Sequence, residues 1–453
     1  MTGLADTELG VGGRFGRVSR LPLLAPLRFR DFRLVWFGES VSLLGDQFHY
    51  VALAWLVLGL TGSGLALGTV LLAAALPRGA LLLVGGALSD RISPRTLTFG
   101  SNLVRAVITT VIAALVIGTS VEIWHLVLAG ALFGSVDAVF FPAIATIVAR
   151  LVPEDRLGPA NAVLQGTQQL MQTIGPALAG FAIAIIGVGA AFAIDALTFG
   201  IAALAIWLVR STGLPGSTPL PSAPSAATEP TPVELDRAPA IDEPSAVVAS
   251  PPRRMSVIAS MAEGALVVMA DPVMRMLVLL STSFNLAFTG PVVVGLPWLV
   301  QVRFGGDAAM LGLLFAAFGG GSLIGVTLAG ILPRTRGLGG LLLGIAGSLG
   351  VGFAAIGFAP PHVVGAVLLM IGCGTGYLNI SIITWTQLRT EPHLLGRTMS
   401  FLMLGSVVGA PLSLAIAGAA VDVDATALFV GAGGLIIATA LAGLATSLPR
   451  RMV

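Results

Sequence analysis

One otherwise apolar segment, residues 33–60, carries polar side chains at intervals of three, four and three residues: Glu39, Ser42, Asp46 and His49. This spacing places all four in one stripe along an α-helix. Ionisable groups in apolar surroundings are costly and usually functional, and carboxyl and imidazole groups exchange protons. We therefore interpret the stripe as a candidate site for reversible proton binding. Permanent ion pairs are the alternative, and for His49 the alternative is a hydrogen-bonded core histidine.

Charged residues in neighbouring apolar segments lie at comparable depths. Counting about 1.5 Å per residue from the segment ends places Asp46, Arg78 and Asp137 roughly 20 Å deep. The same count places Glu39 and Arg105 roughly 10–14 Å deep. Depth matching thus predicts the groups Asp46–Arg78–Asp137 and Glu39–Arg105. Because the apolar segments of the second half hold no central acid, a proton-coupling carboxylate must lie in the first half, with Asp46 and Asp137 as equal candidates.

Amide side chains form a second polar stripe, at Asn161, Gln165, Gln168, Gln169 and Gln172. Amides facing lipid lack hydrogen-bond partners, so we expect this stripe to line a central cavity and to contact a substrate. Amide pairing between helices is the alternative. Further candidates for the cavity wall, besides His49, are Trp55, Asn285, Trp298, Tyr377 and Asn379, although tryptophan at the end of a membrane segment commonly serves as an interface anchor.

The composition indicates that these stripes lie in a membrane. Of the 453 residues, 56% are hydrophobic and only 10% are charged, whereas soluble domains carry about 25% charged residues. A membrane helix needs about 20 apolar residues. We therefore predict an all-α polytopic membrane protein with twelve transmembrane helices in two six-helix bundles, at residues 33–60, 65–89, 96–118, 124–149, 162–186, 189–209, 273–302, 308–332, 338–359, 362–388, 397–420 and 425–448.

The basic residues predict the orientation. All 24 are arginine, and nearly all loop arginines lie on one side of the predicted membrane, with Arg303 as the main exception. The positive-inside rule then places both termini in the cytoplasm and the protein in the cell membrane. The start of the chain lacks the pattern of a cleavable signal peptide. A net charge of +2 is too weak to indicate nucleic-acid binding, and the single cysteine, Cys373, excludes an intramolecular disulfide.

The predicted organisation follows from these segments and from a repeat. The sequence TrpLeuVal recurs at 55–57 and 298–300, and LeuGly recurs at 67–68 and 311–312, so each half is one copy of a six-helix unit around a pseudo-twofold axis. A Pro-, Ser- and Ala-rich stretch between the halves is expected to be a disordered cytoplasmic linker. The expected regions are a cytoplasmic segment 1–32, a bundle 33–210, the linker 211–254, an interfacial helix plus second bundle 255–448, and a tail 449–453.

A short loop motif points to a known family. The loop GALSDRISPR contains Gly86, Asp90, Arg91 and Arg95. It resembles the Gly-x-Leu-x-Asp-Arg-x-Gly-Arg-Arg/Lys signature of the major facilitator superfamily, with Ser93 and Pro94 departing from the pattern. The resemblance implies that this loop clamps the two halves together in one access state.

A second motif, GPALAG, spans Gly175, Pro176 and Gly180. It resembles the Gly-Pro-x-x-Gly-Gly element of the family's antiporter branch, with Ala179 replacing one glycine; a packing kink is the alternative. The stretches GSVDAVFFPA, VPEDRLGPANAV and AEGALVVMADPVMRMLVLL resemble the branch that contains macrolide-efflux pumps and the enterobactin exporter.

This resemblance implies a secondary active exporter of small amphiphilic compounds, such as drugs or natural products, driven by protons through alternating access. Export of an endogenous metabolite such as a siderophore or lysolipid is the alternative, and a non-transporting receptor or enzyme is a remote one. The sequence holds no nucleotide-binding loop, metal-ligand cluster or catalytic triad pattern. We therefore expect no enzymatic activity, no cofactor and no metal, with a small molecule, protons and the lipid bilayer as partners of a monomer.

Overall fold

The computed structural model describes residues 22–89, 92–210, 272–332, 338–390 and 392–445. The expected linker 211–254, most of the N-terminal segment and the C-terminal tail lie outside these residues, as does the predicted interfacial helix. Every regular element in the described part of the chain is helical, as expected from the composition.

The first half contains a short 3-10 helix, η2 (Pro22–Arg28), followed by α1 (Arg30–Thr61), α2 (Gly64–Ser89), α3 (Pro94–Ile117), α4 (Ile123–Leu151), η3 (Glu154–Arg156) and α5 (Leu157–Trp207). The second half contains α7 (Pro272–Gly290), the π-helical segment η4 (Pro291–Gly295), α8 (Leu296–Trp298), a second π-helical segment η5 (Leu299–Arg303), α9 (Ala308–Ile331), α10 (Leu338–Ile356), α11 (Pro361–Arg389) and α12 (Pro392–Ala445). Each predicted segment lies within these helical runs to within a few residues.

Ten helical runs among the described residues are long and apolar enough to cross a membrane. Two of them are too long for one crossing, because a membrane helix needs about 20 residues: α5 has 51 residues and α12 has 54. Both are interrupted. The backbone of α5 leaves helical geometry at Gly187, where φ is 84°, and that of α12 leaves it at Asp424. The positive φ at position 187 suits glycine, which has no Cβ to clash there.

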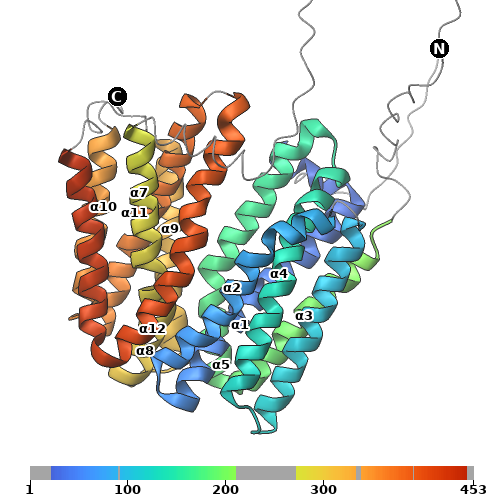
Figure 1. The fold of residues 1–453 in the computed structure, drawn as a ribbon. Coiled ribbons are helices and arrows are strands. Elements are labelled where there is room, and N and C mark those ends of the chain that lie inside the picture. The colour runs from blue at the N-terminus through green and yellow to red at the C-terminus, as the bar shows by residue number, and fades with distance from the viewer. Residues whose placement is uncertain (1–21, 90–91, 211–271, 333–337, 391, 446–453) are drawn as a thin grey trace, which may run out of the picture.

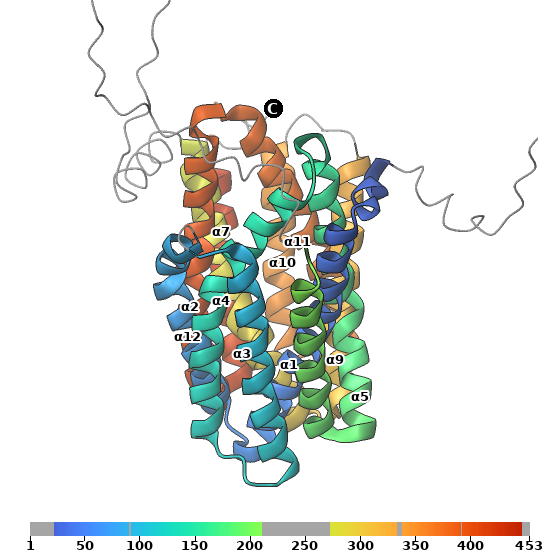
Figure 2. The same cartoon turned by 90° about the vertical axis from the view of Figure 1, so that its right-hand side faces the viewer.

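The two halves stand side by side, with helices running along a common direction (Figures 1 and 2). We call the end where α1 begins and α12 stops the terminal end. The opposite end, where Gly62 separates α1 from α2 and Asp424 interrupts α12, is the contact end. In Figure 1 the halves lie apart at the terminal end and meet at the contact end.

Two glycine crossings join the halves toward the contact end. A Cβ added to Gly68 of α2 would lie 2.9 Å from the Cα of Gly418 in α12, and one added to Gly180 of α5 would lie 3.0 Å from the Cα of Gly312 in α9. Only glycine permits such close contact of helix backbones. Gly68 and Gly312 occupy equivalent places in the sequence repeat, so both crossings follow from the pseudo-twofold arrangement.

Asp422 of α12 also joins the halves. Its carboxylate accepts hydrogen bonds from the Ser63 hydroxyl and from the main-chain N–H groups of Gly64 and Leu65, at 2.6, 2.6 and 3.0 Å. These groups form the N-terminus of α2, whose unsatisfied N–H groups favour an acidic cap. The N-terminus of α9 is capped instead by the adjacent Asp307, which accepts from the Met310 N–H at 2.8 Å.

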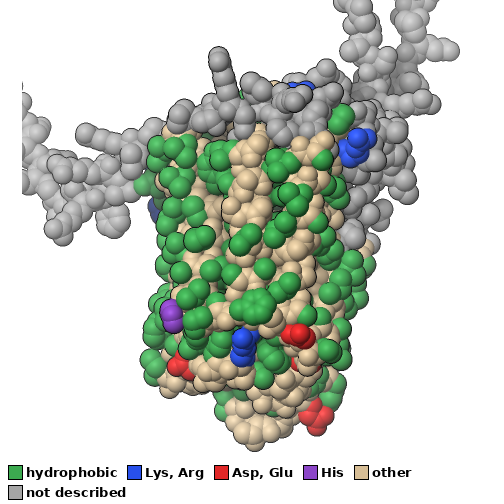
Figure 3. Space-filling view, turned by 90° about the vertical axis from the view of Figure 1, so that its left-hand side faces the viewer, with side chains coloured by type: hydrophobic (Ala, Val, Ile, Leu, Met, Phe, Trp, Pro, Cys, Tyr) green, Lys and Arg blue, Asp and Glu red, His purple; other side chains and the backbone are tan. Residues whose placement is uncertain are grey.

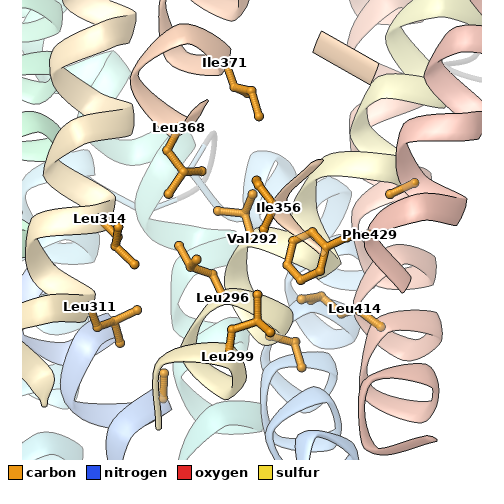
Figure 4. Close-up of a cluster of buried hydrophobic side chains, with 14 of the residues drawn as sticks. Val292, Leu296, Leu299, Leu311, Leu314, Ile356, Leu368, Ile371, Leu414 and Phe429 are labelled. Carbon is orange, nitrogen blue, oxygen red and sulfur yellow. The ribbon is translucent and has the colours of Figure 1, made fainter. Parts of the chain in front are cut away.

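Apolar side chains fill the interior of each half. In the second half Leu296 of α8 and Leu299 of η5 pack in a buried cluster with Leu311 and Phe429 (Figure 4). The outer face of this half carries a broad band of hydrophobic and uncharged side chains, with charged ones gathered toward the contact end (Figure 3). Such a band matches the hydrocarbon core of a bilayer.

Candidate functional site

The first half contains an ion-pair network centred on Asp137 of α4, in which Asp137 and Arg105 are buried and Arg78 is exposed. The Asp137 carboxylate pairs with the guanidinium of Arg105 from α3, and the Arg78 guanidinium from α2 lies 4.0 Å away. Arg105 is only 4% exposed, and its guanidinium carbon lies 4.0 Å from the centre of the Phe140 ring. Ion pairing and the aromatic face together stabilise a positive charge at this depth.

This network confirms one pairing expected from depth and corrects the others. Arg78 lies against Asp137 as predicted, but no ion pair joins it to Asp46, and Arg105 pairs with Asp137 rather than with Glu39. The pairings of Asp46 and Glu39 were wrong because depth along a helix does not specify which neighbouring helix a side chain faces. Arg105 still acts electrostatically on Glu39, but one carboxylate oxygen of Glu39 is buried without a hydrogen-bond partner.

Asp46 forms no ion pair or hydrogen bond with any residue that the structure describes. The charged groups that act most strongly on it include the carboxyls of Asp195, Asp137 and Glu39 and the guanidinium of Arg105. The Asp46 side chain is half-buried rather than enclosed. A carboxyl group that faces other acids and is bound to no cation is costly inside a membrane and is often functional.

A second acid–base pair lies one helical turn from Asp46. The part of α5 that follows Gly187 is called its second arm. The Nδ1 atom of His49 is 3.1 Å from a carboxylate oxygen of Asp195, which is fully buried in this second arm. His49 stacks on Phe133 with the ring centres 5.0 Å apart. Thr198 completes the surroundings of Asp195, since its hydroxyl donates to the Asp195 main-chain carbonyl at 2.7 Å.

From the sequence, Asp195 lies near the outer end of the segment 189–209 and is a weaker candidate for proton coupling than Asp46 or Asp137. Gly45 lies beside Asp195, because a Cβ at position 45 would be 2.7 Å from a carboxylate oxygen of that residue. A glycine immediately before Asp46 is thus what lets α1 approach the second arm of α5. The break at Gly187 falls between the predicted segments 162–186 and 189–209, and it brings that arm back along the bundle.

The cluster holds more acid than base. It contains four carboxyl groups, from Glu39, Asp46, Asp137 and Asp195, but two guanidinium groups, from Arg78 and Arg105, with the His49 imidazole as a further base. A net negative charge in a low-dielectric region is costly, so such a cluster favours uptake of protons or of a cationic ligand.

The glutamine stripe occupies the face of α5 that points between the two halves. With 100° per residue in an α-helix, Gln165, Gln168 and Gln172 fall between Gly175, which packs against Gln47 of α1, and Gly180, which packs against α9. The opposite face of α5 carries exposed apolar side chains, including Leu170 and Leu178. The exposed glutamines therefore face away from lipid, as expected for a cavity lining, while Gln169 is half-buried.

The candidates in the second half are less uniform. Asn379 is exposed on α11 and Tyr377 is half-buried, whereas the Asn285 amide donates to the Ser281 carbonyl of its own helix at 2.8 Å. In the first half, Trp55 of α1 is half-buried and packs against the apolar core. Trp298 lies at the contact end, close enough to Asp422 to influence its carboxylate.

Aromatic rings form the most regular feature of this half. Phe284 and Phe288 of α7 stack with their centres 5.2 Å apart, and Phe318 of α9 lies 5.0 Å from Phe288. All three side chains are half-buried. The second half thus offers an apolar aromatic surface where the first half offers acids and amides.

The two sequence motifs are placed in part. Asp90 and Arg91 lie outside the described residues, and Gly86 lies near the end of α2. Arg95 contacts its own half, because its guanidinium donates to the Ile206 and Trp207 carbonyls at the end of α5.

The glycines of the GPALAG motif provide close helix packing. Gly175 leaves room for Gln47 of α1, and Gly180 forms the crossing with Gly312. Pro176 lies buried between them, and its carbonyl packs directly against Gly312. The motif therefore packs α5 against α1 of its own half and against α9 of the second half.

Comparison with known proteins identifies the fold and the family. The sequence model of the Major Facilitator Superfamily matches residues 35–414. The chain belongs to the Major Facilitator Superfamily. Macrolide efflux protein A of Streptococcus pyogenes is 22% identical over 90% of this chain and 94% of its own length. Multidrug efflux pump Tap of Mycolicibacterium fortuitum is 26% identical over 86% of this chain and 88% of its own.

A solved structure supports the same assignment. The nucleoside transporter NupG aligns with 92% of this chain and 98% of its own, with a TM-score of 0.64 at 13% sequence identity, which shows a common fold. The protein is thus a multi-pass membrane transporter of the Major Facilitator Superfamily, and its relatives and fold are those of transporters rather than enzymes. The predicted family, location and non-enzymatic class are confirmed.

Proposed function

We propose that this Major Facilitator Superfamily transporter is a secondary active exporter that exchanges small amphiphilic compounds for protons. The observation that carries the proposal is the excess of carboxyl over guanidinium groups in the cluster of α1–α5. Such a cluster binds protons when it is empty of substrate and releases them when a competing ligand or a change of access makes ionisation favourable.

Within the cluster we assign proton exchange to Asp46 and to the His49–Asp195 pair. Asp46 has no cation bound to it, and His49 is the more accessible member of its pair, with a side chain 16% exposed against 0% for Asp195. A proton therefore reaches Asp195 through His49. Asp137 lies between two arginines, which favours a structural role. Asp46 and Asp137 were equal candidates for proton coupling from the sequence, and we now favour Asp46.

The proposed cavity lies between the glutamine face of α5 and the aromatic surface of α7 and α9. Amides offer neutral hydrogen bonds and aromatic rings offer apolar contact, a combination suited to amphiphilic compounds. The contacts between the halves at the contact end support alternating access, since opening that end requires breaking the two glycine crossings and the hydrogen bonds of Asp422.

Export rather than import is supported by the two efflux relatives, the macrolide efflux protein and the multidrug pump. The alternative is export of an endogenous metabolite through the same cavity. Deleting the gene in its native host separates these: accumulation of a metabolite inside the cells favours the alternative, whereas increased sensitivity to added amphiphiles without accumulation favours the first proposal.

The decisive experiment uses proteoliposomes with an imposed pH gradient and a panel of fluorescent amphiphilic compounds. The Asp46→Asn variant is expected to lose gradient-driven transport but to retain counterflow, because counterflow needs substrate exchange and no net proton movement. Asp195→Asn is expected to behave in the same way. If gradient-driven transport by Asp46→Asn, Asp195→Asn and Asp137→Asn equals that of the parent, the carboxylate mechanism is wrong.

We propose that the chain crosses the membrane twelve times, with both termini in the cytoplasm, and functions as a monomer. The interruptions at Gly187 and Asp424 support the count, because each gives a helix of more than 50 residues a place to reverse direction. The arginine-rich loops support the orientation. Labelling of single cysteines from outside the cell tests both: position 120 is expected to react, and position 93 is expected to be protected.

A further inference from the structure

A cavity of about 430 Å³ lies at the terminal end of the first half, separate from the charge cluster. It opens where α3 begins and where α4 and α5 end. Its lining includes Arg95, Arg150 and Arg210, one from each of these three places, and none of its described lining residues is acidic. The proposed transport mechanism uses none of these arginines.

Among the residues that the structure describes, no acidic side chain pairs with the three guanidinium groups. Arg95 is fixed by the Ile206 and Trp207 carbonyls, which orient it without neutralising it. Arg150 and Arg210 are exposed and form no ion pair or hydrogen bond within the described part of the chain. Positive charges that converge on one cavity repel one another, and a phosphate group relieves this repulsion with charge-assisted hydrogen bonds to several guanidiniums.

The rest of the lining is apolar. Phe99, Ile147 and Leu151 form a wall that runs from the arginines along the helices, and Trp207 stands at the rim, 60% exposed. A free phosphate ion gains nothing from such a wall, whereas the first carbons of an acyl chain do. Exposed tryptophan at a helix end is typical of the headgroup level of a membrane.

From this arrangement we propose that the cavity binds one anionic phospholipid of the leaflet at the terminal end, with its phosphate between the three arginines and an acyl chain along Phe99 and Leu151. Basic pockets between membrane helices commonly hold anionic headgroups. The bound lipid links the ends of α3, α4 and α5. Because Arg95 closes the GALSDRISPR loop, the lipid also fixes one end of that loop.

The test compares two double variants of the full-length protein that each remove two positive charges at the same end. Arg150→Gln with Arg210→Gln removes two of the phosphate contacts. Arg33→Gln with Arg156→Gln is the matched control, since Arg33 is exposed, the Arg156 side chain is 43% exposed, and neither lines the cavity. Binding of phosphatidylglycerol to detergent-purified protein is measured by native mass spectrometry, with phosphatidylcholine as the uncharged comparison.

The parent and the control are expected to retain one tightly bound phosphatidylglycerol. The Arg150/Arg210 variant is expected to bind it about 30-fold more weakly, which corresponds to about 1 kcal/mol for each arginine. Brominated phosphatidylglycerol should quench a component of the tryptophan fluorescence that Trp207→Phe removes. Equal lipid affinity in the two double variants overturns the site. Thermal stabilisation by inorganic phosphate equal to that by phosphatidylglycerol overturns the lipid assignment in favour of a soluble anion.

Discussion

Removing the Asp422 carboxylate tests whether the closed contact end is stabilised by a helix cap between the halves, in which a residue of the second half caps a helix of the first. Asp422 of α12 caps the N-terminus of α2 across the interface, whereas the equivalent terminus of α9 is capped by Asp307 within its own helix. Asp422→Ala therefore removes a connection between the halves. Asp307→Ala removes the same kind of cap but leaves the interface intact, which makes it the matched control.

The magnitude follows from the three hydrogen bonds that Asp422 accepts. Loss of an N-cap side chain costs about 0.5–2 kcal/mol. Asp422 is exposed to solvent, so a value near the middle of this range, about 1 kcal/mol, is appropriate. When the halves separate, α2 loses this cap in the parent as well, so the whole amount favours separation in the variant. We expect the population open at the contact end to rise about fivefold relative to the closed one.

Pulsed electron paramagnetic resonance measures this population directly. Spin labels at Ser120→Cys and His362→Cys report the distance between the halves at the contact end, in a Cys373→Ala background. Asp422→Ala should enlarge the longer-distance component about fivefold, whereas Asp307→Ala should lower the melting temperature without changing the distances. Adding Ser63→Asp to Asp422→Ala supplies a cap within α2, which should restore stability but not the distance distribution. An unchanged distribution in Asp422→Ala, or an equal shift in Asp307→Ala, refutes the reasoning.

Three further predictions follow from the packing and the charges. In Gly312→Val the Cβ lies only 3.0 Å from the Gly180 Cα, so the same spin labels should move apart more than in Asp422→Ala. In the control Gly344→Val the Cβ meets no atom within 4 Å, so the distance between the labels should not change. Asp137→Asn leaves the buried Arg105 without its carboxylate partner and should lower the free energy of unfolding by about 3–5 kcal/mol. The double variant Arg105→Met with Asp137→Leu removes both charges and should lose less stability. Equal losses in the two variants would argue against a buried ion pair. Gln172→Ala should raise the KM for transport about two- to tenfold with kcat unchanged, while Leu170→Ala on the lipid-facing side should not; equal effects from both would place the glutamine outside the cavity.

Helix positions and the two polar stripes were predictable from the sequence because both depend on local periodicity. The glutamines of α5 are spaced so that they share a face, and contacts on either side of that face orient it between the two halves. Depth predicted that Arg78 approaches Asp137 but not that Arg105 does. Arg78 and Arg105 both converge on Asp137, since lateral neighbours in a bundle are set by packing of small residues such as Gly45 rather than by position along the membrane normal.

The two halves differ in chemistry although they share one repeat. Carboxyl groups gather around α1, whereas Phe284, Phe288 and Phe318 stack in the second half. A compound with a basic group at one end and an apolar ring system at the other then has one favourable orientation, with the base toward α1. Shortening the spacer between these two parts of a substrate should weaken binding more than trimming either part. The transporter should therefore select substrates by the distance between the two parts as well as by their polarity.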